Sequence, residues 1–395
     1  MLLAHFRDSP DAGGSLRVGQ TLALALRRRG VQAELCFGYG GVGPVGREGG
    51  ARCHYLRLRG SHDVLHWSRF RRLIHRIRPH IVHFIDPSVW MHAMAAGTGV
   101  KKVLHVHGIV FQEPTSRRHR IALRFVSRQA DRFVCITHGV RDSVVRHGLA
   151  PAARATVVYN AIDFDMLQRR PGRREARQHL GLPDDARIIG MVCRLVDARG
   201  CDDLLRMLPM LGAEWHALLV GDGPARSRLE RLALMLGVRD RVWFIGSLAD
   251  VRPAYSAMDA YAFLALYDSF GLATAEAMAC RVPVFGLAGE GEFREPQNPL
   301  VTPSNAVFLE RIRRHVFEQE EDESVLRALA ERIAHYGQRP STLAPVIETA
   351  WHHVRTRFST DVQCEDILSV YGRVLEMTLD RPPLAATTTA WQGRT

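Results

Sequence analysis

Two carboxylates flank a strand-to-helix turn in the second half of the chain, and their spacing suits a ligand rich in hydroxyl groups. Asp268 ends an apolar, strand-length run, and seven residues separate it from Glu276 on the helix that follows. Ionised carboxylates accept hydrogen bonds from hydroxyl groups. Between them we expect free backbone amides at Phe270, Gly271 and Leu272, where a helix N-terminus attracts phosphate. A nucleotide sugar fits this pattern, and a plain helix with a solvated Glu276 is the alternative.

A second strand-to-helix loop, residues 193–200, carries two cations. Arg194 and Arg199 lie in it, directly after another strand-length apolar run. Guanidinium groups fixed near a departing diphosphate stabilise the negative charge that grows on it, and so favour the transition state over the ground state. Because arginine is abundant throughout the chain, two solvated surface arginines are the alternative. A glycine-rich turn at residues 221–224 follows the next strand, with Pro224 at the first helical position.

Elements that end at a common edge must hold these loops, and the hydrophobic pattern predicts them. Apolar strand-length runs alternate with amphipathic helix-length stretches along the chain. This alternation predicts an α/β protein with two doubly wound, Rossmann-like domains facing a central cleft, each a parallel sheet covered by helices on both faces. Ligands bind beyond the carboxyl ends of the strands in such sheets. The predicted strands cover residues 2–6, 32–37, 80–86, 103–107 and 132–137 in the first half, and 188–195, 217–220, 242–245, 260–264 and 282–287 in the second.

The length of the chain and a break in the pattern locate the domains. A chain of 395 residues exceeds what one hydrophobic core usually supports, and an arginine-rich polar segment at 168–178 interrupts the apolar rhythm. We therefore predict a first domain over residues 1–165 and a second over residues 166–357, which holds both loops described above. A final segment over 358–380 and a disordered tail over 381–395, rich in Pro, Ala and Thr, complete the chain.

The charge and cysteine content narrow the class of protein and its partners. A formal net charge of +12 favours anionic partners such as phosphate groups, lipid headgroups or nucleic acid. No apolar run is long enough to span a membrane, the N-terminus lacks a secretory pattern, and the seven cysteines contain no CxxC pair. We therefore expect a cytoplasmic protein without a disulfide framework or a zinc ribbon. The absence of a known nucleic-acid-binding module and of GxGxxG after the first strand disfavours nucleic-acid binding and NAD chemistry.

Arginine clusters on two segments of the first domain indicate a membrane contact. Residues 64–78 and 117–128 both combine several arginines with apolar side chains. Basic amphipathic helices of this composition lie on anionic bilayers, where each nearby cation contributes about 1 kcal/mol. Peripheral contact with an anionic membrane, at its inner face, is therefore one expectation. The alternative is that the apolar stripes pack on the sheet and that the arginines are solvated.

Four segments, in one order along the chain, resemble a known family. CRLVDARG at 193–200, VGDGP at 220–224, VWFIGSL at 242–248 and YDSFGLATAEAMA at 267–279 look like the donor-binding half of the family 4 glycosyltransferases, which have the GT-B fold. The first half agrees more loosely, through AGG at 12–14, HVHG at 105–108 and VVYNAID at 157–163. The stretch from Phe358 to Leu375 resembles the family's closing helix, so residues 358–380 are expected to cross back onto the first domain.

The resemblance implies a role for each residue that carries chemistry. Glu276 would bind the ribose hydroxyls, and Asp268 would lie near the hydroxyls of the donor hexose. Arg194 and Arg199 would bind the diphosphate, and His107 would line the donor sugar. The family retains the anomeric configuration, and its usual proposal has the leaving phosphate act as the base. No dedicated protein base and no metal cofactor are therefore expected.

Other positions complete the family pattern or depart from it. Gly14 would lie against the phosphates or the acceptor, and the backbone around Gly246 would meet the base. Asp268 stands where the family usually has glutamate and is one methylene shorter, which leaves the donor sugar open. The loop after residue 287 only partly resembles the family's glycine-rich donor-sugar loop. Glu290 and Glu292 either hold sugar hydroxyls there or belong to a solvated acidic loop.

The predicted function is retaining transfer of a hexose or N-acetylhexosamine from a nucleotide diphosphate sugar, UDP-linked by preference. The acceptor is a glycan, a lipid-linked molecule or a small molecule. Two alternatives keep the fold: a sugar-nucleotide epimerase or hydrolase, and a catalytically silent scaffold that binds the nucleotide sugar. No metal site is expected, because His105 and His107 share one side of a strand without a third ligand, and the acidic pair Asp163 and Asp165 lies at the hinge.

Overall fold

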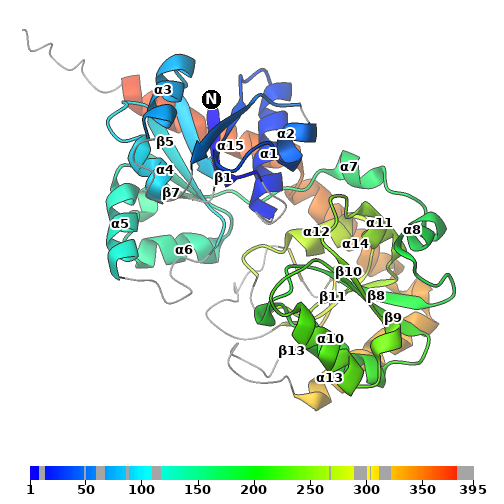
Figure 1. The fold of residues 1–395 in the computed structure, drawn as a ribbon. Coiled ribbons are helices and arrows are strands. Elements are labelled where there is room, and N and C mark those ends of the chain that lie inside the picture. The colour runs from blue at the N-terminus through cyan, green and yellow to red at the C-terminus, as the bar shows by residue number, and fades with distance from the viewer. Residues whose placement is uncertain are drawn as a thin grey trace, which may run out of the picture.

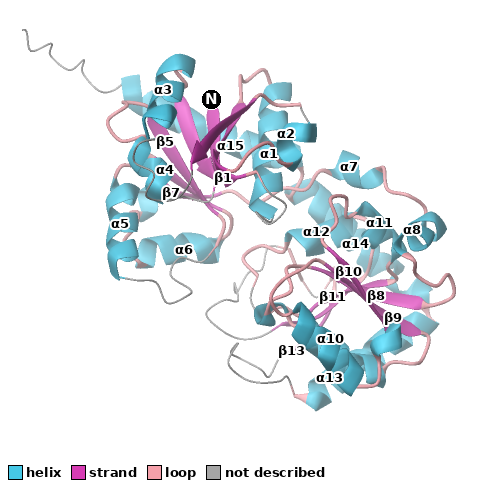
Figure 2. Ribbon diagram, viewed as in Figure 1, coloured by secondary structure: helices cyan, strands magenta, loops and turns pink. Residues whose placement is uncertain are grey.

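The computed structural model describes residues 1–8, 14–48, 50–58, 67–85, 89–108, 117–266, 268–288, 300–302, 304–310 and 322–379. The ribbon shows two α/β units side by side (Figures 1 and 2), each built on one parallel sheet. This arrangement confirms the predicted fold class of two doubly wound, Rossmann-like domains. Within the described ranges, none of the helices combines the length and the apolar character that a membrane crossing requires.

The first sheet has seven parallel strands in the order β3-β2-β1-β4-β5-β6-β7. The alternation of side chains along β1 supplies both faces with apolar groups, since Leu2 and Ala4 pack in one cluster and Leu3 in another. The strands are β1 (Leu2–Arg7), β2 (Glu34–Tyr39), β3 (Cys53–Leu58), β4 (Ile81–Ile85), β5 (Lys101–Val106), β6 (Arg132–Cys135) and β7 (Ala155–Val157). The helices between them are α1 (Gly14–Arg28), α2 (Pro44–Glu48), α3 (Trp67–Ile77), α4 (Val89–Met94), α5 (Arg117–Arg128) and α6 (His138–Arg146).

The second sheet has six parallel strands in the order β10-β9-β8-β11-β12-β13. Its strands are β8 (Arg187–Val192), β9 (Trp215–Val220), β10 (Val242–Gly246), β11 (Ala260–Phe263), β12 (Val284–Ala288) and β13 (Val307–Glu310). The accompanying helices are α7 (Phe164–Gln168), α8 (Arg173–Leu180), α9 (Cys201–Met207), α10 (Arg226–Met235), α11 (Arg252–Ala257), α12 (Leu272–Ala279), α13 (Glu323–Gln338) and α14 (Ala344–Arg357). Three strands, β3, β7 and β13, were not among those predicted from the sequence, and all three lie at sheet edges.

The strand order of each sheet reverses at one point, and this point locates the ligand-binding loops. The reversal lies between β1 and β4 in the first sheet and between β8 and β11 in the second. In open parallel sheets, ligands bind outside the carboxyl ends of the strands at such a switch point. The arginine loop follows β8, and the Asp268 turn follows β11. The topology therefore brings the two predicted loops to one place.

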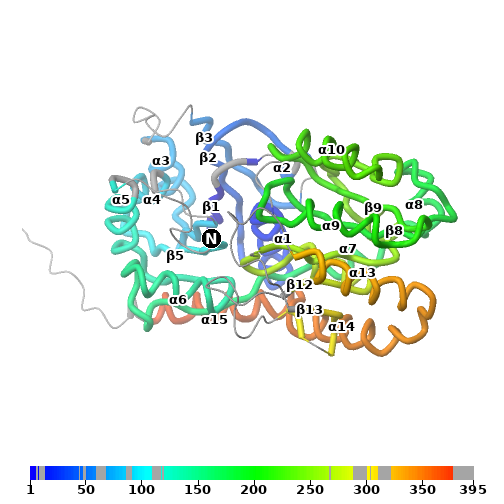
Figure 3. The backbone as a smooth tube through the Cα atoms, turned by 90° about the horizontal axis from the view of Figure 1, so that it is seen from below, coloured from blue at the N-terminus to red at the C-terminus, as the bar shows by residue number. Residues whose placement is uncertain are grey.

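A long C-terminal helix, α15 (Thr360–Leu379), returns to the first domain. Figure 3 shows it lying along that domain, whereas α14 lies on the second. Its side chains of Cys364, Ile367 and Val370 join the apolar cluster that includes Leu3 of β1. The two segments that connect the domains meet in a parallel bridge between residues 162 and 359. The final helix thus packs where the family resemblance places it.

Candidate active site

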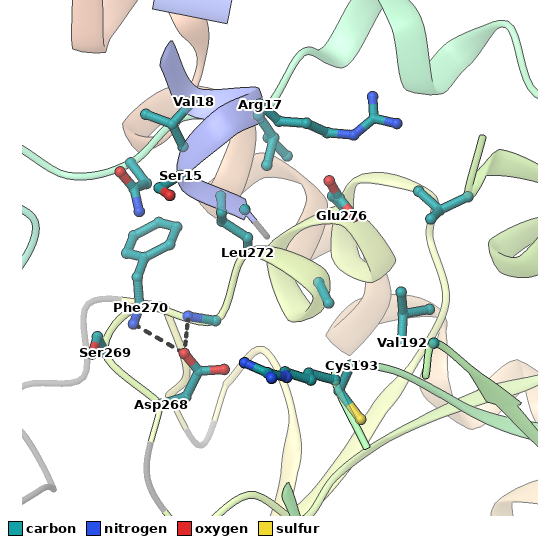
Figure 4. A pocket seen from close by; sticks show the side chains of 18 of the residues that line it. Ser15, Arg17, Val18, Val192, Cys193, Asp268, Ser269, Phe270, Leu272 and Glu276 are labelled. Atoms are coloured by element: carbon teal, nitrogen blue, oxygen red, sulfur yellow. Dashed lines mark hydrogen bonds between the residues drawn. The ribbon is translucent and has the colours of Figure 1, made fainter. Parts of the chain in front are cut away.

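A cavity of about 1260 Å³ lies between the two domains, at the carboxyl ends of their strands. The first domain contributes the start of α1, the end of β5 and the segment 160–163, and the second contributes the loops after β8, β9, β10 and β11. Figure 4 shows side chains from α1 and α12 facing each other across this space. The cavity is lined by most of the residues predicted to carry chemistry: Gly14, His107, Arg194, Arg199, Asp268, Phe270, Gly271, Leu272 and Glu276.

Close backbone packing fixes the arginine loop. The amide of Leu195 donates to the carbonyl of Asp222 at 3.0 Å, and the carbonyl of Leu195 accepts from the amide of Ala225 at 3.0 Å. A Cβ atom on Gly221 would lie 1.9 Å from the carbonyl oxygen of Cys193, and one on Gly223 would lie 2.3 Å from that of Leu195. Only glycine fits at both positions. The glycine-rich turn after β9 therefore serves as the support of the arginine loop.

Arg199 and Asp268, to which the sequence assigned separate roles, form an ion pair. The Nη1 atom of Arg199 lies 2.7 Å from Oδ2 of Asp268. Arg194 lies in the same loop and is exposed to the cavity. Opposite charges at this distance hold each other in place until a stronger partner competes. Both arginines therefore face the cavity, with Arg199 already oriented by a carboxylate.

The N-terminus of α12 differs from the expectation of free amides. The amides of Phe270 and Gly271 donate to Oδ1 of Asp268 at 3.3 and 3.1 Å, as the dashed lines of Figure 4 show. These amides are not free because Asp268 lies two and three residues ahead of them, a position from which an aspartate side chain reaches backbone donors. The helix itself begins at Leu272, and Gly271 precedes it with a φ of 89°. Asp268 thus binds two of the amides that the sequence predicted to be free for a phosphate.

Glu276 lies deeper in the cavity, one turn into α12. Its Oε2 atom accepts a hydrogen bond from the hydroxyl of Tyr255 at 2.6 Å. Burial raises the pKa of Glu276, and the hydrogen bond from Tyr255 and the charge of Arg17 offset part of this increase. The carboxylate keeps a second oxygen for a ligand hydroxyl. This position is compatible with the ribose-binding role that the resemblance implies.

Arg17 of α1 is a candidate binding residue that the sequence analysis missed. It lines the cavity from the first domain, donates to the carbonyl of Ala249 in the second, and carries the charge that acts on Glu276. Figure 4 shows its guanidinium extending on the side of the cavity where Glu276 lies. The sequence contained one signal for it, a cation in the first turn of the helix that starts at Gly14. Whether this cation reaches the ligand cavity depends on how the two domains pack, which the local sequence does not show.

The remaining predicted positions are distributed over both walls. A Cβ on Gly14 would lie 2.6 Å from Cδ1 of Leu272, so this glycine permits the close approach of α1 to α12. His107 directly follows β5 at the cavity, and its ring centroid lies 4.2 Å from that of the fully buried His105. The carbonyl of Gly246 accepts from the amide of Gly221 at 2.8 Å, and the next residues, 247 and 248, line the cavity.

The hinge contributes a polar group and an aromatic cluster. Asn160 is 2% exposed and lines the cavity, and its Oδ1 atom has no hydrogen-bond partner in the described part of the chain. The resemblance included this residue in the hinge motif but gave it no role. The ring of Phe270 lies 5.3 Å from that of Phe358 and 6.4 Å from that of Tyr159. The side chain of Phe270 therefore joins the two domains.

Asp163, one of the acidic pair at the hinge, has a structural role. Oδ1 of Asp163 accepts from the amide of Met166 at 3.0 Å and caps α7. Among the residues that the structure describes, no group of three His, Cys, Asp or Glu side chains is arranged to hold a metal ion. Glu290 and Glu292, assigned to the donor-sugar loop, lie outside the described residues.

Two family models match consecutive parts of the chain. The model for Glycosyltransferase Family 4 matches residues 12–166, and the model for Glycosyl transferases group 1 matches residues 172–302. Among curated proteins, the D-inositol 3-phosphate glycosyltransferase of Mycobacterium tuberculosis is 36% identical over 173 residues, which are 41% of this chain and 35% of that protein. The match thus spans about a third of the length of this relative.

Solved structures share the fold across nearly the whole chain. The structure of HepE from Anabaena in complex with UDP and glucose covers 94% of this chain and 100% of its own, with a TM-score of 0.77 and 18% identity. Sucrose-phosphate synthase from Thermosynechococcus elongatus covers 95% of this chain and 100% of its own, with a TM-score of 0.74 and 17% identity. With both halves matched by glycosyltransferase models and both sheets arranged as in these structures, the chain belongs to the family 4 glycosyltransferases of the GT-B fold.

Proposed function

We propose that this protein is a retaining glycosyltransferase that moves a hexose or N-acetylhexosamine from a UDP-linked donor to a glycan, lipid-linked or small-molecule acceptor. The observation that carries the proposal is the convergence of two arginines and two carboxylates, Arg194, Arg199, Asp268 and Glu276, on one cavity between the domains. UDP is the preferred nucleotide because the structural neighbour HepE was solved with UDP, and also with UDP-glucose.

The residues suggest how the donor would be held. Glu276 accepts hydrogen bonds from the ribose hydroxyls through the oxygen that Tyr255 does not use. The diphosphate competes with Asp268 for Arg199 and for the amides that open α12, and Asp268 is then released toward the hydroxyls of the donor sugar. A phosphate offers more charge than one carboxylate to these donors. The carboxylate therefore preorganises the site for an anion.

The transfer itself needs charge stabilisation more than a protein base. As the bond between the anomeric carbon and the phosphate oxygen breaks, an acceptor oxygen bonds to that carbon from the same face, and the acceptor proton passes to a phosphate oxygen. Negative charge grows on the diphosphate during this step, and Arg194 and Arg199 stabilise it. Two fixed guanidinium groups provide the positive charge that a metal ion supplies in other enzymes. We therefore propose transfer without a metal cofactor.

A thermal-shift screen across UDP-, GDP- and ADP-linked sugars tests the choice of donor. A ligand that binds only the folded protein stabilises it by about 2.7 kcal/mol at a hundred times its Kd. We expect the largest increase in Tm with a UDP-linked sugar, and the same increase in the presence of EDTA. Equal, negligible shifts for all nucleotide sugars would contradict the proposal.

Product analysis with and without an acceptor then tests the reaction. A transferase yields a new glycoside only when the acceptor is present, and the anomeric configuration of that product reports retention. Release of free sugar without an acceptor would indicate a hydrolase, and an altered nucleotide sugar an epimerase. A donor that binds without turnover under any of these conditions would indicate a silent scaffold. Chelation followed by addition of manganese tests the absence of a metal requirement.

We also propose that the outward face of α5 contacts an anionic membrane. Of the two basic segments, α3 buries its apolar side chains, since Phe70, Leu73 and Ile74 are at most 6% exposed. On α5, by contrast, Ile121 and Phe125 are 58% and 62% exposed. Arginines at positions 117, 120, 124 and 128 are exposed on the same helix, which contains no acidic residue. Apolar groups framed by cations suit the headgroup region of a bilayer, and this location would suit a lipid-linked acceptor.

A further inference from the structure

Two cysteine thiols lie at the two ends of the arginine loop. Cys193 directly follows β8, and Cys201 is the first residue of α9. Their Sγ atoms are 3.6 Å apart, and the seven residues between them include Arg194 and Arg199. This distance is short enough for a hydrogen bond between the thiols, and closing it by less than 2 Å gives a disulfide bond of about 2.05 Å.

The two thiols differ in exposure and in acidity. Cys193 is partly exposed and lines the cavity, whereas Cys201 is 1% exposed and packs in the core of the second domain. The hydrogen bond from Cys201 and the charge of Arg199 lower the pKa of Cys193, although burial acts in the opposite direction. The same hydrogen bond and burial raise the pKa of Cys201. Cys193 is therefore the nucleophile of the pair, with Cys201 as its resolving partner.

The other five cysteines do not share this environment. Burial raises the pKa of each of them, and none is paired with another cysteine at a comparable distance. Cys53 is the one among them that is partly exposed. Oxidants that act on thiolates should therefore reach Cys193 first, because thiolate content and access together decide which cysteine reacts.

We infer that Cys193 and Cys201 form a redox-active pair, in which oxidation by a peroxide closes a disulfide across the arginine loop and weakens nucleotide binding. The thiolate of Cys193 attacks one oxygen of hydrogen peroxide, the O–O bond breaks, and hydroxide leaves and takes up a proton to form water. The sulfur of Cys201 then attacks the resulting sulfenic acid, the S–O bond breaks, and a second water leaves with the thiol proton. Two thiols lose two electrons in total, and the peroxide gains them.

The loop must deform when the disulfide closes, because both of its ends are clamped. On one side, the amide of Cys193 donates to the carbonyl of Val220 at 3.0 Å, and the carbonyl of Cys193 touches Gly221. On the other side, Gly200 has a φ of 69°, and a Cβ on it would lie 2.1 Å from the carbonyl oxygen of Leu264. Leu195 is also held, by its backbone bonds to Asp222 and Ala225, so the displacement falls on residues 196–199. Arg199 then moves relative to Asp268 and loses its alignment toward the cavity.

Peptide mapping tests the disulfide without reference to any activity. The purified protein is treated with a small excess of hydrogen peroxide, its free thiols are blocked with N-ethylmaleimide, and it is digested with trypsin. Trypsin cleaves after Arg194 and Arg199, so the two cysteines fall on separate peptides, 188–194 and 200–206, with one cysteine each. We expect these two peptides to be joined after oxidation and separate after dithiothreitol. Absence of this linkage, or linkage of other cysteines in its place, would overturn the inference.

Two variants make the chemistry specific. Cys201→Ser keeps a hydroxyl that donates to Cys193 but cannot form a disulfide, so the sulfenic acid should persist at Cys193 and react with dimedone. Cys53→Ser removes the other partly exposed thiol and should leave the linkage of the two peptides as in the wild type. Equal dimedone labelling of Cys193 in the oxidised wild type and in Cys201→Ser would show that Cys201 does not resolve the sulfenic acid and would contradict the pair.

The effect on binding rests on the proposed function and is measured separately. Oxidation should raise the Kd of the wild type for UDP at least fivefold, and dithiothreitol should restore it, whereas Cys201→Ser should show less than a twofold change. Linkage with an unchanged Kd would overturn the regulatory part of the inference. If the reduced wild type itself does not bind UDP, the proposed function fails, while the peptide linkage still decides whether the thiols form a pair.

Discussion

Asp268 accepts three hydrogen bonds at the cavity, one from Arg199 and two from the amides of Phe270 and Gly271. These donors are the ones that a phosphate group would use. A single carboxylate therefore holds a cation and a helix N-terminus in the geometry of an anion site. A glutamate, with one more methylene, would bring its carboxylate less readily to the amides two and three residues ahead. The shorter side chain thus explains the hydrogen bonds to the amides of Phe270 and Gly271. Through Arg199, Asp268 also links the turn before α12 to the arginine loop.

Alanine at Arg194 or Arg199 should reduce kcat much more than it affects folding. Removing one group that stabilises developing charge typically costs about 3 to 4 kcal/mol, or 10² to 10³ in rate. Both side chains lie at the cavity, outside the core, and the pair between Arg199 and Asp268 is partly solvated. Its loss should lower the free energy of unfolding by less than about 1 kcal/mol. Kinetics and urea unfolding of the same preparations measure both effects.

Arg228 supplies the matched control for these two substitutions. It pairs with Asp197 of the same loop at 2.7 Å but does not line the cavity. Arg228→Ala should therefore leave kcat within about twofold, because it removes only a surface ion pair. Arg199→Lys should recover much of the activity, since one positive charge still reaches the phosphate without the bidentate fork. Near-normal kcat in Arg194→Ala or Arg199→Ala would indicate that the arginine of that variant is a solvated surface residue without a role in the reaction.

Substitution of Glu276 should weaken donor binding more than it slows turnover of bound donor. Hydrogen bonds to a charged group contribute about 1.5 to 3 kcal/mol, so Glu276→Ala should raise the Kd for the donor about tenfold to a hundredfold or more. Tyr255→Phe removes the hydrogen bond that orients the carboxylate and should have a smaller effect in the same direction. Calorimetric titration with UDP measures both. An unchanged Kd in a folded Glu276→Ala protein would exclude the ribose role.

At the scale of elements, periodicity predicted the central strands and the loops after β8 and β11, because these strands are apolar on both faces. Periodicity missed β3, whose sequence CHYLRL mixes polar with apolar residues at a partly exposed edge. The bonds of Asp268 could not be predicted, since they depend on a side-chain conformation and on an arginine 69 residues away. The position of Arg17 at the cavity could not be predicted either, because it depends on the contact between α1 and the second domain. Local pattern therefore located the site, and the packing of distant elements determined its hydrogen bonds.

The exposed face of α5 should bind anionic vesicles in a salt-sensitive manner. We expect sedimentation with phosphatidylserine-containing liposomes at low ionic strength and little with neutral ones, because screening weakens the contribution of each arginine. Serine at both Ile121 and Phe125 should abolish most of this binding without affecting stability, since both side chains are exposed.

A control pair for α5 lies on α10 in the second domain. Leu234 and Met235 are 63% and 82% exposed, but α10 contains the acidic residue Glu230, and two of its arginines, Arg226 and Arg228, are paired with carboxylates. Serine at these two positions should leave vesicle binding unchanged. Equal losses from both pairs would indicate nonspecific apolar adsorption. Equally poor sedimentation with anionic and neutral vesicles would favour a freely soluble acceptor.

At the scale of the whole molecule, the site depends on how the two domains are held together. The carbonyl of Phe358 accepts from the amide of Ile162 at 2.9 Å, and the rings of Tyr159, Phe270 and Phe358 pack around this crossing. On the cavity side, Gly14 lies against Leu272, a contact that any larger residue would disturb. The same hinge that joins the domains therefore also positions the first residues of α12. A change in the arrangement of the domains would therefore also change the geometry of the candidate active site.

We expect the protein to lose stability in mild acid, because two neutral histidines are buried near the interface between α15 and the first sheet. His83 and His105 are fully buried there, and Nδ1 of His83 is hydrogen-bonded to the hydroxyl of Tyr371 at 2.6 Å. Burial lowers the pKa of His83 to about 3 and that of His105 well below its usual value, with a smaller contribution from the charge of His107 in each case. In the unfolded chain both histidines titrate near pH 6.5. The unfolded state therefore binds protons first as the pH falls.

The resulting loss should be measurable between pH 6 and pH 5, above the ordinary pKa values of Asp and Glu in the unfolded chain. Stability contributed by the neutral histidines is fully present above pH 6.5 and falls by about 1.4 kcal/mol per pH unit for each of them. His105→Leu should remove one of these contributions, so its urea midpoint should change less than that of the wild type over this interval. His80→Gln, at an exposed histidine of the same domain, should follow the wild type. Parallel pH dependence in the wild type and in His105→Leu would mean that His105 is not held neutral between α15 and the sheet.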